Sequence, residues 1–119
     1  MADVHAPDTP PFDSQALLRR LHGDAALAKA MAALLLQELP AQTQALHRAV
    51  ETANVEGVAQ VAHALRGAVS NFGADEVARA AYNLERMAVD GRLADSADAQ
   101  KTFDDAVARL IPALRELTA

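Results

Sequence analysis

The chain has 119 residues and no cysteine, so it is long enough for one domain with a core and forms neither disulfides nor thiolate metal sites. Hydrophobic residues make up 51% of it, but only three Phe and one Tyr are aromatic, a composition that favours helices over strands. The net charge of −5 leaves no basic stripe for nucleic acid and no cationic face for anionic lipid.

Residues 1–12 are predicted to be a flexible leader, because Pro7, Pro10 and Pro11 disfavour a helix, and the folded domain is predicted to span 13–119. The leader has neither the basic region nor the apolar segment of a secretory signal. The most apolar window, 25–36, contains Lys29 and is too short to span a bilayer. We therefore expect a cytoplasmic protein that does not bind membranes.

Two helices are predicted in the first half of the domain. Asp13 or Ser14 can cap a short helix that ends at Gly23, and Asp24 can cap a long second helix. In this second helix apolar residues recur at three- and four-residue spacing: Leu27, Met31, Leu34, Leu35, Leu39, Leu46 and Val50. Pro40 interrupts the stripe. We expect it to kink one long helix, although two abutting helices are the alternative.

Three more helices complete the predicted fold. The third runs from its cap Asn54 to about Phe72, the fourth from Asp75 to Asp90, and the fifth begins at Ser96. Four substantial amphipathic helices on short loops predict an all-α fold, an antiparallel four-helix bundle with a short additional N-terminal helix.

His63, in the third helix, is the residue that points to chemistry. With Leu65 at the centre of the buried stripe, His63 lies about 160° and Gly67 about 200° around the helix, on its solvent side. A glycine inside a helix costs roughly 1 kcal/mol relative to alanine, and a glycine that faces outward recovers none of this by packing. We interpret Gly67 as clearing space around the imidazole for a partner.

Three polar residues are expected near His63. Glu85 lies twelve residues after Gly73, as His63 lies ten before it, so the two are at similar height on adjacent helices. A carboxylate that accepts the Nδ1–H leaves the Nε2 lone pair outward, although the angle of His63 leaves this contact open. Arg66, at i+3, suits a transferring phosphoryl group. Ser70, on the same face, can donate a hydrogen bond. No phosphate-binding glycine loop or kinase motif is present, so a phosphoryl group has to come from another protein.

The run His63-Ala64-Leu65-Arg66-Gly67, followed by Asn71-Phe72-Gly73-Ala74 and Leu84-Glu85, resembles the histidine-containing phosphotransfer (HPt) domain. The resemblance spans residues 12–117. It implies a helical bundle that relays phosphoryl groups between receiver domains, with His63 phosphorylated and Gly67 admitting the receiver. Arg66 takes the place of the family lysine that accompanies the phosphate, and Glu85 that of a Gln or Glu bonded to the histidine.

We therefore expect a phosphocarrier rather than an enzyme, a monomer that moves a phosphoryl group from one receiver aspartate to another. The expected partners are receiver domains of response regulators or hybrid histidine kinases. No cofactor of its own is expected, and Mg²⁺ is expected on the partner receiver. Docking is predicted through the first helix, by Leu17, Leu18 or Leu21, and through neighbouring parts of the second and third helices.

Two other functions are alternatives to this one. A silent adaptor would bind a receiver or kinase partner without carrying phosphate, but such a module has no reason to keep both His63 and Gly67. A metal site in the bundle core needs an inward Glu-x-x-His pair, whereas Gln60 precedes an outward His63. The remaining histidines, His5, His22 and His47, are interpreted as structural or solvent-facing.

Overall fold

The computed structural model describes residues 10–119, and within this range the regular secondary structure is entirely helical. Its elements are α1 (Ser14–Arg20), α2 (Ala25–Glu51), α3 (Val55–Ser70), α4 (Asp75–Val89), the short 3₁₀ turn η1 (Leu93–Asp95) and α5 (Ala97–Thr118). The predicted all-α class is confirmed for this part of the chain. The flexible leader was predicted for 1–12, and residues 1–9 of it lie outside the described range.

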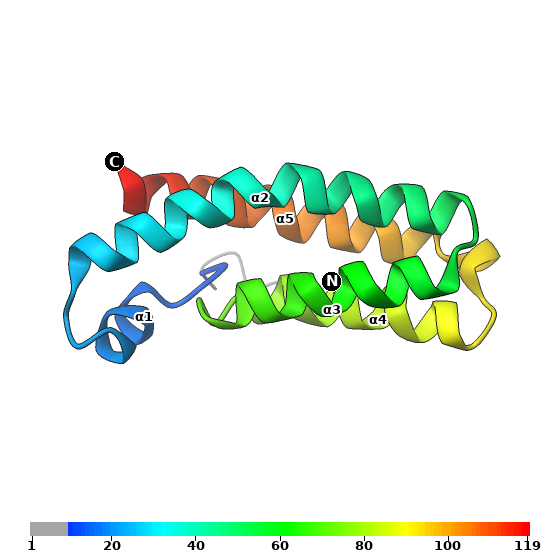
Figure 1. Ribbon diagram of the computed structural model, residues 1–119, viewed down its shortest axis with the longest axis horizontal. Helices are drawn as coiled ribbons and strands as arrows, with labels where there is room; N and C mark the ends of the chain where they lie inside the picture. Colours follow the sequence, from blue (N-terminus) through cyan, green and yellow to red (C-terminus); the bar gives the residue numbers. More distant parts are fainter. Residues whose placement is uncertain (1–9) are drawn as a thin grey trace, which may run out of the picture.

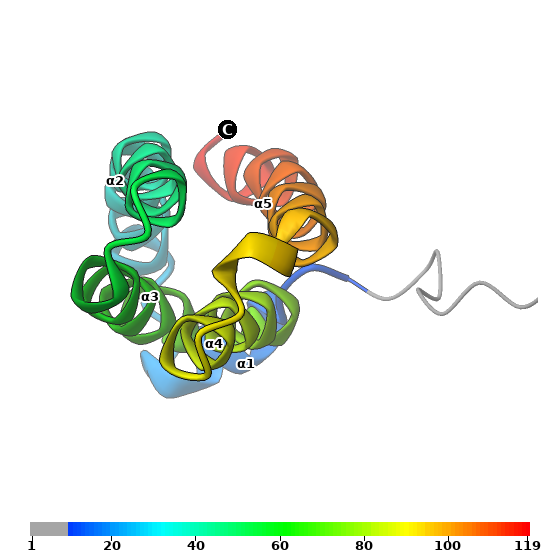
Figure 2. The same cartoon turned by 90° about the vertical axis from the view of Figure 1, so that its right-hand side faces the viewer.

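Helices α2 to α5 lie side by side along the long axis of the molecule, and the chain reverses direction between each of them and the next (Figure 1). Viewed from the end, they surround a common centre: α3 packs on α2 and α4, and α5 packs on the same two helices from the other side (Figure 2). Helix α1 lies at the end of this bundle where the α3–α4 turn is found (Figure 1).

Short polar side chains fix where the helices begin. Asp13 accepts a hydrogen bond from the Ala16 amide at 3.0 Å, and Asp24 accepts one from the Leu27 amide at the same distance. Asn54 caps α3 through the Gly57 amide, also at 3.0 Å. Each cap satisfies an amide that has no partner in the first helical turn. The predicted caps are therefore confirmed, with Asp13 rather than Ser14 serving α1.

Helix α2 continues through Pro40 as one element, as predicted. Figure 1 shows that its first half is inclined to its second half. A proline has no amide hydrogen and its ring crowds the carbonyl four residues earlier, which is a recognised cause of such bends.

No helix in the described range is both long enough and apolar enough to cross a membrane.

The core differs from the sequence-based expectation at three places. Leu27 and Leu34 belong to the predicted apolar stripe of α2, yet they are 45% and 55% exposed. The stripe is wider than the surface that α3 and α5 cover, so only its centre, with Leu35 and Leu39, is buried. Phe12, which was assigned to the leader, is buried and packs edge-on against Phe72 with ring centroids 5.7 Å apart. The folded domain therefore begins before residue 13.

Candidate functional site

His63 lies on the exposed face of α3, across the helix from the fully buried Leu65. No residue in the range 10–119 forms a hydrogen bond or ion pair with its imidazole. Both ring nitrogens are therefore available to a partner molecule. This exposure follows from the buried stripe, since Val58, Ala62, Leu65 and Val69 turn the opposite side of α3 into the core.

Gly67 lies one turn after His63 and is exposed as well. A Cβ placed on Gly67 would meet no atom within 4 Å outside its own helix turn. Gly57, in the first turn of the same helix, is different: a Cβ placed there would lie 2.7 Å from the side-chain nitrogen Nδ2 of Asn54. Packing within the chain thus accounts for a glycine at position 57 and does not account for one at position 67.

Arg66 and Glu85 come together across the α3–α4 hairpin. Gly73, with φ of +66°, ends α3 and allows α4 to return along it. The Nη1 of Arg66 donates to Oε1 of Glu85 at 3.2 Å. The guanidinium carbon also lies 4.9 Å from the ring centroid of Tyr82, one turn earlier on α4. Arg66 is therefore held by two side chains of the neighbouring helix.

The predicted contact between Glu85 and His63 is not formed among the described residues. The reason is angular: Arg66 lies about 100° around α3 from Leu65, on the side of α4, whereas His63 lies about 160° away and faces solvent. Glu85 therefore reaches Arg66 first. Tyr82 was not identified from the sequence, and its position three residues before Glu85 was the signal that places it on the same face of α4.

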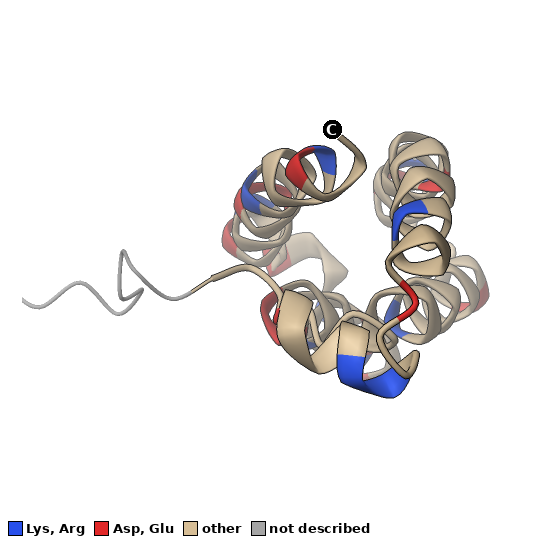
Figure 3. Ribbon diagram, turned by 90° about the vertical axis from the view of Figure 1, so that its left-hand side faces the viewer, with Lys and Arg blue, Asp and Glu red and all other residues tan. Residues whose placement is uncertain are grey.

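Ser70 was predicted only as a possible hydrogen-bond donor on this face. Its hydroxyl donates to the Gly67 carbonyl at 3.0 Å, so in this structure its hydrogen is used inside α3. The end of α3 is completed by Arg20, whose guanidinium donates to the Asn71 carbonyl at 2.7 Å. The last turn of α1 carries Arg19 and Arg20. Figure 3 shows basic residues, in blue, on the short helix at this end of the bundle.

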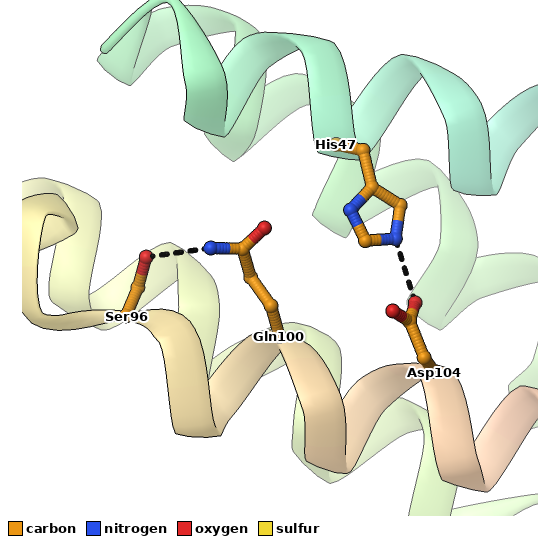
Figure 4. Close-up of polar contacts among 4 residues, drawn as sticks. All are labelled: His47, Ser96, Gln100 and Asp104. Carbon is orange, nitrogen blue, oxygen red and sulfur yellow. Dashed lines mark hydrogen bonds and ion pairs between the residues drawn. The ribbon is translucent and has the colours of Figure 1, made fainter.

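The other histidines have different surroundings. His5 lies outside the described residues, and His22 is exposed in the α1–α2 turn. His47 on α2 contacts Asp104 on α5, with Nε2 2.6 Å from Oδ1, as Figure 4 shows. The pairing of imidazole and carboxylate that was expected at His63 is thus found at His47 instead. Next to it, Gln100 donates to the buried Ser96 hydroxyl at 3.1 Å (Figure 4).

An apolar hollow borders α3 on the side of α2, away from Arg66. It measures about 120 Å³ and is open to solvent. Its lining consists of Met31, Leu34, Leu35, Glu38, Ala68, Asn71 and Phe72. Ala68, the residue that follows Gly67 in the sequence, is one of the residues that α3 contributes to this lining. Within residues 10–119, no cluster of three or more His, Asp or Glu side chains is suited to a metal ion.

A comparison with protein-family models matches the chain to one family. The family model of the Hpt domain matches residues 30–116, which include His63, Arg66, Gly67 and Glu85. Comparisons with curated proteins and with solved structures gave no match. Hpt domains are helical phosphocarriers of two-component phosphorelays; they contain no kinase domain and interact with receiver domains. The chain belongs to the Hpt domain family.

Proposed function

We propose that this protein accepts a phosphoryl group on His63 from the aspartate of a receiver domain and passes it to the aspartate of another. The observation that supports this most directly is the exposed, unpaired imidazole of His63 beside a glycine with open space above it. An attacking nitrogen has to reach phosphorus while the receiver backbone lies close to α3. A side chain at position 67 would occupy this space.

The transfer is an in-line displacement at phosphorus. The Nε2 lone pair of His63 forms the N–P bond as the P–O bond of the aspartyl phosphate breaks. The receiver carboxylate leaves with the bonding electron pair, and the imidazole proton stays on Nδ1. The reverse displacement delivers the group to the next receiver. Mg²⁺ belongs to the receiver in this proposal, and our protein acts as a cytoplasmic monomer with no cofactor of its own.

Arg66 is the cation of this chain that is nearest in sequence to His63 on the same helix. Side chains three residues apart on a helix are neighbours, so a phosphoryl group on His63 lies within reach of the guanidinium. Guanidinium groups bind phosphate oxygens through several N–H donors at once. Since Glu85 contacts Arg66 and not His63, we assign Glu85 to the environment of the cation.

The receiver is proposed to dock over α2 and α3 rather than chiefly over α1. Leu17 is buried, so it contributes nothing to a docking surface, whereas Leu18 and Leu21 remain partly exposed. Leu27 and Leu34 are exposed apolar side chains of α2, and Leu34 lines the hollow together with Ala68 of α3. Exposed apolar residues of this kind are typical of a protein interface.

The proposal is tested with receiver domains of the source organism that carry ³²P on their aspartate. We expect acid-labile, base-stable label on the wild-type protein and none on His63→Gln. His47→Gln is the matched control, because His47 is partly exposed but paired with Asp104, and this variant should be labelled normally. Label that survives His63→Gln overturns the proposal. A receiver that binds tightly without ever transferring label would show the silent adaptor instead.

A further inference from the structure

Tyr82 and Glu85 hold the Arg66 guanidinium in different ways. The centroid of the Tyr82 ring lies 4.9 Å from the guanidinium carbon of Arg66. This contact with the face of the ring uses none of the N–H donors of Arg66. Glu85 accepts from Nη1 at 3.2 Å and so occupies a donor. A guanidinium has five N–H donors in one plane. The donors that Glu85 does not use can form hydrogen bonds with another anion.

The two partners therefore act in opposite directions on an arriving phosphate. The Tyr82 ring is uncharged and fixes the side chain, so Arg66 loses less conformational freedom when it binds phosphate oxygens. The Glu85 carboxylate competes for the same donors and repels a second anion. The Arg66–Glu85 ion pair is only partly buried, with side chains 38% and 23% exposed, so phosphate can displace the carboxylate.

We propose that Tyr82 is a positioning residue that holds Arg66 for the phosphoryl group on His63, while Glu85 weakens this interaction by competing for the guanidinium. The proposal rests on the function proposed above. It predicts that replacing Tyr82 destabilises the phosphorylated state of His63, whereas replacing Glu85 stabilises it. If both residues only supported the structure of α4, the two substitutions would change this stability in the same direction.

The quantity to measure is the equilibrium constant for transfer of the phosphoryl group from the receiver aspartate to His63. The protein concentrations are kept low enough that little of either protein is bound in a receiver complex. This constant depends only on the free proteins and their phosphorylated forms. Loss of a docking contact slows the approach to equilibrium but leaves the constant unchanged. Tyr82 is 43% exposed and could contact a receiver, so this readout separates positioning from docking.

We expect Tyr82→Leu to lower the equilibrium constant by about two- to fivefold, because Arg66 without the ring loses more side-chain conformational freedom when it binds the phosphate oxygens. Tyr82→Phe keeps the ring and should match the wild type. Glu85→Gln should raise the constant by a similar factor. Val89→Ala is the matched control, because Val89 is exposed like Tyr82 and lies two turns further along α4, away from the turn that holds Arg66. It should leave the constant unchanged.

A second background tests whether Tyr82 acts through Arg66. In Arg66→Gln protein, Tyr82→Leu should have no further effect on the constant. Independently of phosphate, the Arg66 Nε–H resonance should lose its ring-current shift in Tyr82→Leu and keep it in Tyr82→Phe. An unchanged constant in Tyr82→Leu, or an effect that persists without Arg66, overturns the inference. Absence of label on wild-type His63 would instead remove the proposed function itself.

Discussion

The Arg20 guanidinium donates a hydrogen bond to the Asn71 carbonyl at 2.7 Å and a weaker one to the Ser70 carbonyl at 3.3 Å, and so joins α1 to the end of α3. The carbonyls at a helix C-terminus carry partial negative charge and have no partner within the helix. Arg20 supplies both the hydrogen bonds and the positive charge. It thereby fixes the short first helix next to the helix that carries His63.

Arg20→Ala should lower the free energy of unfolding by about 1 kcal/mol, which is less than is typical of hydrogen bonds to a charged group because the site is exposed. Urea denaturation followed by circular dichroism measures this. Arg19→Ala is the matched control, since the described residues provide no polar partner for Arg19, and it should change stability by less than about 0.5 kcal/mol. Equal effects of the two substitutions would contradict the role of Arg20.

The two glycines of α3 should respond differently to alanine. Gly67→Ala adds a methyl group in open space and should raise the free energy of unfolding by up to about 1 kcal/mol through helix propensity. Gly57→Ala gains the same propensity but displaces the Asn54 side chain, whose cap is worth about 1 kcal/mol. Thermal and urea denaturation should therefore rank Gly67→Ala above Gly57→Ala. In an Asn54→Ala background this difference should shrink to what the remaining contact with Ala49 Cβ, at 3.3 Å, accounts for.

A larger residue at position 67 should separate folding from transfer. Gly67→Leu has room within the chain, so unfolding should be no easier than in the wild type. If the receiver backbone approaches α3 there, the initial rate of label transfer to His63 should fall by at least about tenfold, which corresponds to 1.4 kcal/mol in the barrier. The matched substitution Ala64→Leu also lies on the exposed side of α3 and should slow transfer less. A Gly67→Leu protein with the wild-type rate would show that the open space has no part in docking.

Ala53 takes a left-handed backbone conformation, with φ of +53°, between α2 and α3. This conformation costs a residue with a Cβ roughly 1 kcal/mol, and glycine adopts it freely. Ala53→Gly should therefore stabilise the protein or leave it unchanged, despite the greater entropy of the unfolded chain. Ala33→Gly, at an exposed helical position of α2, should destabilise it by about 1 kcal/mol. If Ala53→Gly lowered the denaturation midpoint as Ala33→Gly does, this account would be contradicted.

The features that local chemistry determines could be predicted from the sequence. Asp13, Asp24 and Asn54 cap helices because a short polar side chain bonds to an amide three residues away, and this needs no tertiary information. The exposure of His63 follows equally from the periodicity of α3, since the apolar residues around Leu65 leave only one side of the helix for solvent. Part of the motif that resembles the HPt domain lies in this same segment, and the family model matches residues 30–116.

The remaining features depend on how helices are placed relative to one another. Glu85 was predicted at the correct height beside α3, but its partner is set by how α3 and α4 are rotated about their axes, and this rotation brings it to Arg66. The same rotation places Tyr82 over the guanidinium. Leu34 is exposed because the width of the stripe on α2 exceeds what its neighbours cover. The apolar periodicity of one helix does not determine how far a neighbouring helix is rotated about its axis or how far away it lies.

The contact of His47 with Asp104 joins α2 to α5, and its contribution to stability should be small. Nε2 and Oδ1 are 2.6 Å apart, but the side chains are 39% and 44% exposed, so water and salt screen the interaction. A double-mutant cycle of His47→Ala and Asp104→Ala should give a coupling energy of about 0.5–1 kcal/mol that falls at high salt. The same cycle with His63 and Glu85 should give none, because these residues do not touch. A coupling between His63 and Glu85 as large as that between His47 and Asp104 would mean that the carboxylate reaches the phosphate-accepting imidazole in solution, and that Arg66 is not its main partner.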